Sequence, residues 1–302
     1  MSGWTAGRNT LPETPGDVRG SDVMIRVALT ILATYMTVAA LPLLAWSMTE
    51  RTWLPLTTHL AALAVTFLCA SRRNLPRWRR DWLPLALVPL LYVELRWVIA
   101  GFGRPHADAL IAAWDSTLFG SEPSRTLALR WHSVAVSELL HLCYIAYYAI
   151  VYVPPALLWL KGRHREFAAT TLALVIMYTI CFIAFVLLPV DGPRFLSGPS
   201  AAPEGPVRAI VIRLLAAGSS RGTAFPSAHV AASVVAALYA LRFQRTLGIA
   251  IVVLTAGMMV GAVYGGYHYA VDVIAGLVTG LLSAAIARAV EHAITGTSAA
   301  PR

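Results

Sequence analysis

The chain contains 302 residues, of which 58% are hydrophobic and only 13% are charged. A soluble domain carries about 25% charged residues, so this composition excludes an ordinary soluble protein. The net charge is +9, and Lys161 is the only lysine. Most of the arginines lie in short segments between apolar runs, where they indicate membrane topology and phosphate binding. We therefore expect a membrane protein with no nucleic-acid partner.

The apolar runs predict an all-α, polytopic membrane helical bundle of about eight transmembrane helices. We expect these helices near residues 23–48, 53–70, 82–101, 133–160, 167–189, 224–242, 246–264 and 270–290. The same pattern divides the chain into a disordered cytoplasmic tail (1–22), two additional N-terminal transmembrane helices (23–81), a six-helix core (82–292) and a second tail (293–302).

Arginine placement predicts the orientation of the chain. Basic segments over 72–80, 161–165 and 242–245 fall on one side when eight spans are counted, and both termini share that side. The positive-inside rule makes this side cytoplasmic. Loops 102–132 and 190–223 then face outward. We expect a multi-pass protein of the plasma membrane with cytoplasmic termini and a functional site at the extracytoplasmic face.

The most informative stretch precedes the last apolar run and contains His268 and Asp272. These residues stand at i and i+4, so their side chains are expected to meet on one helix face. A carboxylate there can hold one imidazole nitrogen as an N–H donor and leave the other nitrogen free as a nucleophile or base. The pair is a candidate catalytic dyad.

A second polar stretch, Pro226-Ser227-Ala228-His229, opens the sixth apolar run. Pro226 suits a first helical residue, and the free backbone N–H groups and helix dipole that follow would suit phosphate. Ser227 could instead simply cap its helix. A single histidine at a membrane helix end is often only an interfacial residue. Two such histidines, with Gly192-Pro193-Arg194 ahead of them, favour a phosphoryl-transfer site.

The two long outer loops each contain apolar residues at helical spacing, near 110–118 and 207–215, which predicts helices lying along the membrane interface. Acidic residues of the first loop could hydrogen-bond a polyol substrate: Asp108, Asp115 and Glu122. Four ionisable residues also lie within the third and fourth apolar runs, where they serve either helix packing or substrate binding. These are Glu94, Arg96, Glu138 and His141.

The two histidine stretches resemble the second and third signatures of the type 2 phosphatidic acid phosphatase superfamily. Ala228 stands where the second signature usually has glycine, and Gly261-Ala262 stand where the third usually has Ser-Arg. Gly192-Pro193-Arg194 replaces the first signature. Together with His141-x-x-Tyr144, this pattern resembles the inositol phosphorylceramide synthase and inositolphosphotransferase branch. The resemblance covers the third to eighth apolar runs and implies a phosphatase-like catalytic core.

The resemblance implies that His268 is the nucleophile that takes the phosphoryl group, that Asp272 orients it, and that His229 exchanges the proton. The residues expected to bind phosphate are Arg194, Ser227 and Arg221. Further substrate contacts are expected from His141, Tyr144, Asp191 and Tyr267. We expect neither a metal nor a cofactor, because no clear carboxylate cage for Mg²⁺ is present.

Three functions remain open. The first is a metal-independent lipid phosphotransferase that passes a phosphoryl group or phospho-headgroup from a lipid donor through a phosphohistidine to an alcohol acceptor. The second is a lipid phosphate or diphosphate phosphatase, in which water is the acceptor. The third is a non-enzymatic transporter or scaffold, which the paired signatures and the lack of visible inverted repeats disfavour. The Gly-Pro-Arg motif and the long outer loops favour the first.

Overall fold

The computed structural model describes residues 15–72 and 75–298. Its helices are α1 (Pro15–Glu50), α2 (Leu54–Ser71), α3 (Arg77–Phe102), α4 (Asp108–Phe119), α5 (Pro123–Arg130), α6 (Val134–Ile145), α7 (Tyr147–Leu160), α8 (His164–Leu187), α9 (Pro193–Leu196), α10 (Pro206–Gly218), α11 (Ala228–Phe243), α12 (Arg245–Tyr264) and α13 (Ala270–Ser298). Over these residues the only β feature is an isolated bridge between Val190 and Thr223. The prediction of an all-α polytopic membrane bundle is confirmed.

Six helices are long and apolar enough to cross a membrane: α1, α2, α3, α8, α12 and α13. The other two predicted spans differ from expectation. The fourth is not one straight helix, because α6 and α7 meet at a 40° bend. The sixth is shorter, because residues 224–227 are not helical and Ser227 caps α11 by accepting a hydrogen bond from the Val230 N–H. The 16 residues of α11 extend about 24 Å, less than the roughly 30 Å of a bilayer core.

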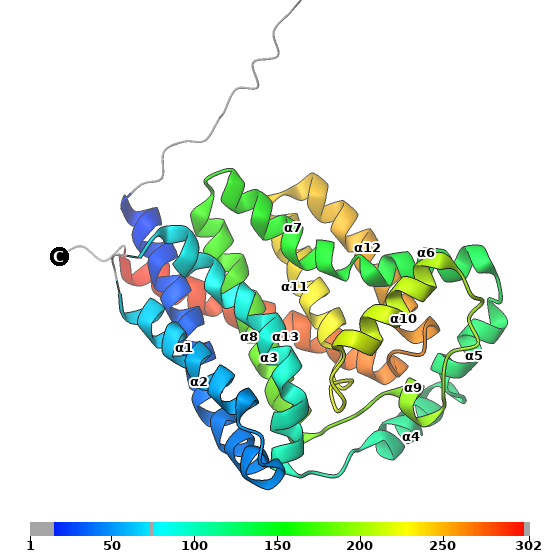
Figure 1. Cartoon of the computed structure of the whole chain (residues 1–302). Helices are drawn as coiled ribbons and strands as arrows, with labels where there is room; N and C mark the ends of the chain where they lie inside the picture. The colour runs from blue at the N-terminus through cyan, green and yellow to red at the C-terminus, as the bar shows by residue number, and fades with distance from the viewer. Residues whose placement is uncertain (1–14, 73–74, 299–302) are drawn as a thin grey trace, which may run out of the picture.

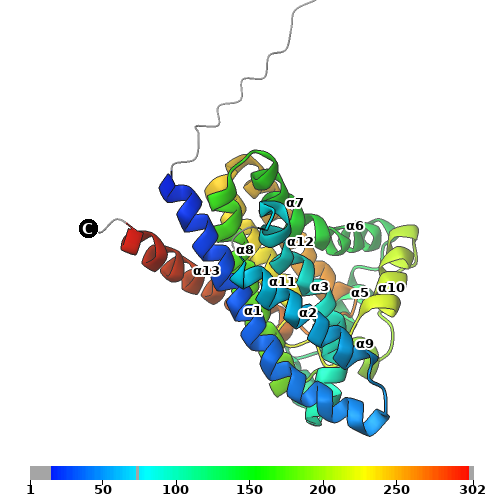
Figure 2. The ribbon, with the colours of Figure 1, turned by 60° about the vertical axis from the view of Figure 1, so that its left-hand side comes forward.

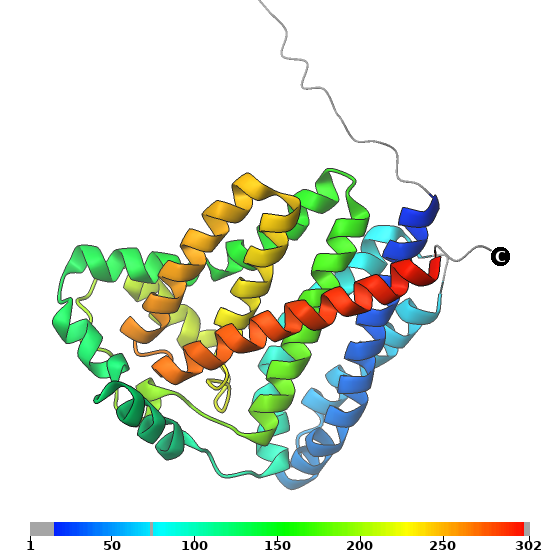
Figure 3. The same cartoon turned by 180° about the vertical axis from the view of Figure 1, so that it is seen from behind.

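The predicted N-terminal tail is helical where it is described, because α1 begins at Pro15. Residues 1–14 and 299–302 lie outside the described residues, and residues 293–298 of the predicted C-terminal tail extend α13. Figures 1 and 3 show the start of α1 and the end of α13 on the same side of the bundle as the turns after α7 and α11. These turns belong to the arginine-rich segments that the topology prediction placed together.

Helix α8 lies at the centre of the bundle and packs against α1, α3, α11 and α13. Figure 3 shows α13 crossing α8 diagonally. Two small residues let α13 approach α11 closely: a Cβ atom added at Gly276 would lie 2.5 Å from the Ser227 carbonyl oxygen, and one at Gly280 would lie 2.8 Å from that of Ala231. This close helix packing holds the two histidine stretches next to each other.

Helices α1 and α2 lie side by side against α3 (Figure 2), and the buried His59 of α2 contacts both α1 and α3. His59 Nδ1 is 2.7 Å from Glu94 Oε2, and His59 Nε2 is 2.9 Å from the carbonyl oxygen of Met36. Arg96 does not join this pair, because its Nε donates to the carbonyl of Val93. Of the two roles considered for Glu94, the structure therefore shows helix packing.

The shorter helices α4, α5, α9 and α10 lie at the end of the bundle away from the described termini (Figure 1). Helices α4 and α10 coincide with the two segments predicted from apolar spacing. The start of α10 is held by Glu138 of α6, whose carboxylate accepts hydrogen bonds from the backbone N–H groups of Val207 and Arg208 at 2.8 and 3.1 Å. Glu138 thus also serves packing, by capping a helix N-terminus.

Candidate active site

Backbone contacts bring three distant segments together at this end of the bundle. The loop after α8 and the loop before α11 are joined by the Val190–Thr223 bridge and by a 2.8 Å hydrogen bond from the Ala224 N–H to the Val190 carbonyl. The Ser227 N–H donates to the carbonyl of Asp272 at 3.0 Å. Arg194, His229 and His268, which lie on these segments, consequently line one pocket.

His268 lies in the turn between α12 and α13, two residues before α13 begins. Asp272 caps this helix, because its Oδ2 accepts a 2.8 Å hydrogen bond from the Tyr269 N–H. The predicted contact between His268 and Asp272 is present, with 3.5 Å between His268 Nδ1 and Asp272 Oδ2. A closer partner is the carbonyl oxygen of Ala224, 3.1 Å from the same nitrogen. Since a carbonyl can only accept, Nδ1 carries the proton and Nε2 keeps its lone pair.

Burial changes the acid–base behaviour of His268, which is only 4% exposed. Desolvation of the charged form, followed by the positive charge of Arg194, lowers the pKa of His268 to about 4. The ring is therefore neutral near pH 7, as a nitrogen nucleophile requires.

His229 occupies the first turn of α11 and faces His268, with 5.9 Å between the ring centroids. Two tyrosine rings flank it: Tyr144 is stacked at 5.4 Å, and Tyr147 lies at 4.3 Å. None of the described residues accepts a hydrogen bond from the backbone N–H groups of Ala228 and His229. These two donors at a helix N-terminus therefore remain available to an anion.

Arg194 lies in the short helix α9 and lines the same pocket as the two histidines. Its Cζ atom lies 4.6 Å from the centroid of the Phe195 ring. Its buried Nε donates to no described residue, and within the described part of the chain no carboxylate lies within ion-pair distance of it. A guanidinium in this state can bind two phosphate oxygens at once.

The other predicted site residues divide into two groups. Tyr144, Asp191 and Tyr267 line the pocket. Three others do not line it: Ser227, Arg221 and His141. The Ser227 hydroxyl caps α11, and the exposed Arg221 pairs with Asp191 through its Nε at 3.0 Å. His141 Nδ1 lies 2.6 Å from the Ser137 carbonyl oxygen, and its ring contacts the Tyr267 ring. The structure thus brings together the two histidines, Asp272 and Arg194, and it places three expected contacts outside the pocket wall.

A family model described as the PAP2 superfamily matches residues 109–286, from α4 into α13. This match covers more than half of the chain and includes both histidine stretches and Arg194. The chain belongs to the PAP2 superfamily. Comparisons with curated proteins and with solved structures found no match. Membership confirms the resemblance at the level of the superfamily and supports a phosphatase-type enzyme that acts on lipid phosphates.

In this PAP2-superfamily chain, two buried carboxylates of α4 hold the loops of the site. Asp115 accepts hydrogen bonds from the N–H groups of Ala270 and Val271 at 3.1 and 2.8 Å. Asp108, seven residues earlier and on the same helix face, accepts from those of Asp191 and Gly192 at 3.0 and 2.9 Å. One carboxylate fixes the segment after His268, and the other fixes the segment before Arg194.

These contacts overturn the expectation that Asp108 and Asp115 bind a polyol, because all four of their oxygens already accept backbone hydrogen bonds. Gly192 allows this arrangement, since its φ of +96° favours glycine. Glu122 makes none of these contacts, and its Oε2 lies 3.9 Å from Nη1 of Arg125. Sequence reasoning missed the positioning role of α4, although two acidic residues seven positions apart in an amphipathic helix share one face.

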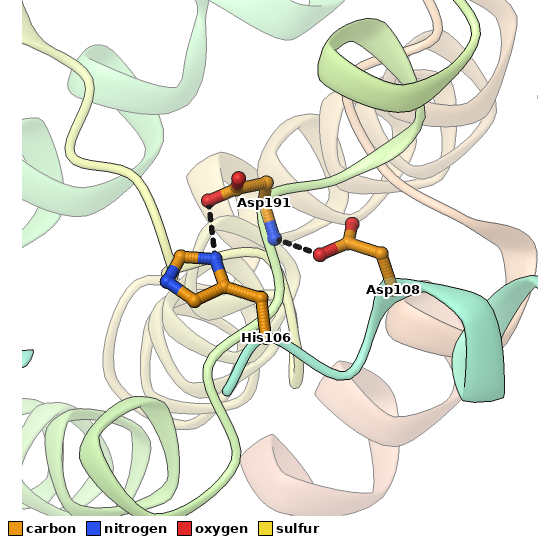
Figure 4. A group of neighbouring side chains, drawn as sticks. All are labelled: His106, Asp108 and Asp191. Atoms are coloured by element: carbon orange, nitrogen blue, oxygen red, sulfur yellow. Dashed lines mark hydrogen bonds and ion pairs between the residues drawn. The ribbon is translucent and has the colours of Figure 1, made fainter. Parts of the chain in front are cut away.

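Figure 4 shows His106, Asp108 and Asp191, whose donor atoms lie close enough together to hold a metal ion. His106 Nδ1 lies 2.9 Å from Asp191 Oδ1, which also accepts from the Gly222 N–H at 2.8 Å. Arg221 binds the other oxygen of Asp191. Because the carboxylates already accept these hydrogen bonds, the cluster serves as a junction between loops. A metal ion would have to displace its contacts, and the expectation of a metal-free site stays a prediction.

Two wider cavities adjoin the pocket that is lined by Arg194, His229 and His268. The first, of about 210 Å³, is apolar and is lined by His229 and six tyrosines: Tyr92, Tyr144, Tyr147, Tyr148, Tyr152 and Tyr178. The second, of about 410 Å³, is lined by Arg194, Arg208 and Arg221. The sequence did not indicate Tyr92, Tyr147 or the Ala224 carbonyl as parts of the site. A backbone carbonyl has no sequence signature, and a tyrosine in an apolar run has the appearance of ordinary core.

Proposed function

We propose that this protein is a membrane phosphotransferase that passes a phosphoryl group or phospho-headgroup from a lipid donor through a phosphohistidine at His268 to an alcohol acceptor. The observation that carries the proposal is the arrangement of His268, His229 and Arg194 around one pocket. His268 presents a neutral ring with Nδ1 held, His229 faces it, and Arg194 has a guanidinium without a carboxylate partner among the described residues.

The first half-reaction begins with attack of His268 Nε2 on phosphorus, and the bond between phosphorus and the lipid oxygen breaks. His229 gives its proton to the leaving oxygen, while Arg194 and the N–H groups at the start of α11 hold the other phosphate oxygens. The negative charge of a bound phosphate favours the protonated form of His229. Asp272 and the Ala224 carbonyl keep the His268 ring oriented throughout.

The second half-reaction separates a transferase from a phosphatase. An acceptor hydroxyl gives its proton to His229, attacks phosphorus and releases His268. The near-complete burial of His268 supports transfer, because a transferase must keep water from the phosphohistidine. The branch-like Gly192-Pro193-Arg194 motif supports an acceptor of the inositol type. Superfamily membership is equally compatible with a lipid phosphate or diphosphate phosphatase, which is the second candidate.

Partitioning of labelled phosphate tests the proposal. Purified full-length protein in lipid nanodiscs would be given labelled lipid monophosphate, diphosphate and phosphodiester donors, with rising concentrations of inositol and other alcohols. For transfer, we expect label to move from free phosphate into acceptor product as the alcohol concentration rises. Rapid release of free phosphate with every alcohol would instead support the phosphatase.

Metal independence is a separate part of the proposal. Vanadate, which mimics five-coordinate phosphorus, should inhibit the enzyme, and EDTA should leave its rate unchanged. Loss of activity in EDTA that a divalent ion restores would contradict the metal-free mechanism and would direct attention to the cluster in Figure 4.

We also propose that the protein lies in the plasma membrane with cytoplasmic termini and an outward-facing site, that 23–81 is an N-terminal addition, and that 82–292 is the catalytic core. The arginine-rich turns opposite the site support this orientation. Ala201 is exposed in the loop before α10. In a cysteine-free background, Ala201→Cys should react with an impermeant thiol reagent in intact cells. Reaction only after lysis would contradict the orientation.

A further inference from the structure

The phosphohistidine mechanism uses Arg194 but leaves the rest of the cavity lined by Arg194, Arg208 and Arg221 without a ligand. This cavity shares Arg194 and Tyr267 with the catalytic pocket, and its volume is about 410 Å³. No carboxylate is among its lining residues within the described chain. It therefore offers room and positive charge directly beside the position of the reacting phosphate.

The three guanidinium groups differ in how far they are neutralised. Arg221 is paired with Asp191, so its charge is largely balanced. Arg208 has a side chain that is only 9% exposed, and its one ion-pair partner among the described residues is Glu204, at 3.6 Å and with a side chain 96% exposed. Water weakens such a contact, so Glu204 neutralises little of the positive charge of Arg208. Arg194 has no ion-pair partner among the described residues, which leaves two guanidinium groups able to bind anions.

Arg208 is also held in place more firmly than a surface arginine. Its Nη2 donates to the Ser200 carbonyl at 3.1 Å, and its backbone N–H donates to Glu138 Oε1 at 3.1 Å. A guanidinium has five N–H donors, so one carbonyl and one distant carboxylate leave donors unused. A buried, preorganised cation with spare donors is costly unless an anion completes its contacts.

We propose that this cavity binds a second anionic group of the substrate, on the polar side of the reacting phosphorus, with Arg208 as its main ligand. The substrate class is then a lipid donor whose headgroup beyond the reacting phosphate carries a further phosphate or carboxylate. The apolar, tyrosine-lined cavity adjoins the same pocket through His229 and lacks arginine, so the lipid chain and the anionic headgroup occupy different cavities. This inference rests on the proposed function, because it takes Arg194 and the histidines as the phosphate site.

Binding of chain-free phosphonates tests the second site without turnover. Full-length His268→Ala protein would be titrated calorimetrically in nanodiscs with methylphosphonate and with alkane diphosphonates that carry one to four methylene groups. At least one diphosphonate should bind about tenfold more tightly than methylphosphonate, because a second charge-assisted contact adds to the first. Arg208→Gln in the same background should remove this preference. Arg213→Gln, an exposed arginine of the same helix outside the cavity, should preserve it.

The outcomes separate the two proposals. Equal affinity for methylphosphonate and every diphosphonate would overturn the second site and leave the phosphate site standing, as would a preference that survives Arg208→Gln. If neither ligand binds, the phosphate site itself fails, and the second site fails with it. If Arg208→Gln does not fold, Arg208→Lys provides the check: it keeps the charge but loses the planar fork, so the diphosphonate preference should fall. An unchanged preference in that variant would count against Arg208.

Discussion

His268 and His229 line the same pocket, but their local environments differ. His268 lies in a turn, where the Ala224 carbonyl and Asp272 hold its Nδ1. His229 lies in a helix between two tyrosine rings, and neither of its ring nitrogens bonds to a described residue. A nucleophile needs a fixed ring with one free lone pair, whereas a proton carrier needs a ring that can gain and lose a proton. The two environments therefore predict different defects when each residue is changed.

The largest effect is expected from His268→Ala, because no phosphohistidine can form without it. Turnover should fall by about 10⁴-fold or more, to the level left by binding and electrostatics alone. Steady-state kinetics with a labelled lipid donor measures this loss, and thermal unfolding checks that the protein stays folded. Activity within about a hundredfold of the parent would show that another group makes the attack.

His229→Ala should lower turnover by roughly 10²- to 10⁴-fold, the range of general acid–base catalysis. It should leave His268 able to react with a donor whose leaving oxygen needs no proton. With a nitrophenyl phosphodiester donor, we expect labelled phosphohistidine to accumulate on the protein. If the acid-labile label is absent with this donor, the division of roles between the two histidines is wrong.

Arg194 lines the pocket together with both histidines, and we propose that it holds the phosphate between them. Arg194→Lys keeps the charge and loses the two-pronged contact, so kcat/KM should fall by roughly tenfold or more, and Arg194→Ala should lose more. Arg213→Gln, which lies outside the pocket, is the matched control. Near-normal kinetics for Arg194→Ala would remove this arginine from the site.

Asp115→Asn sharpens the comparison, because it disturbs the segment that follows His268 and leaves the surroundings of His229 unchanged. The amide keeps one acceptor oxygen but directs an NH₂ group toward a backbone N–H at the start of α13. We expect a loss of about 1–2 kcal/mol in the free energy of unfolding, as for a lost helix cap. Formation of phosphohistidine should slow, while subsequent release to the acceptor changes less. Thr117→Ala, an exposed change in α4, controls for the helix. Equal slowing of both steps would contradict a role confined to His268.

The smallest expected effect concerns pH. The pKa of His268 is lowered to about 4, so the ring stays mostly neutral down to pH 5. The rate contribution of His268 should therefore fall by only about 10% between pH 7 and pH 5, whereas a pKa of 6.5 would remove most of it. The folded protein binds fewer protons than the unfolded chain here, so stability should decline as pH falls from 6.5 toward 4. NMR titration of ¹⁵N-labelled histidine checks the value, and a midpoint near 6.5 would contradict the buried, fixed ring.

The sequence by itself determined the fold class and several of the residues that line the candidate pocket. A hydrophobic run long enough to cross a bilayer predicts a helix from its own residues alone. The stretches around His229 and His268 are short motifs that can be recognised in the same local way. Helices α4 and α10 could also be predicted, since apolar spacing is a local property. Arg194 could be singled out because its motif lies in the long loop that precedes both histidine stretches.

Only the tertiary structure decided which groups each of these residues contacts. The carbonyl that holds His268 belongs to Ala224, 44 positions away, and a backbone carbonyl leaves no mark in the sequence. From the sequence, Asp108 and Asp115 could bind a substrate and Arg221 could bind phosphate. In the folded chain, backbone N–H groups donate to both aspartates, and Asp191 pairs with Arg221. Hydrogen-bond donors and acceptors pair with whatever the packing of distant helices brings near them, so their final partners depend on the assembled bundle.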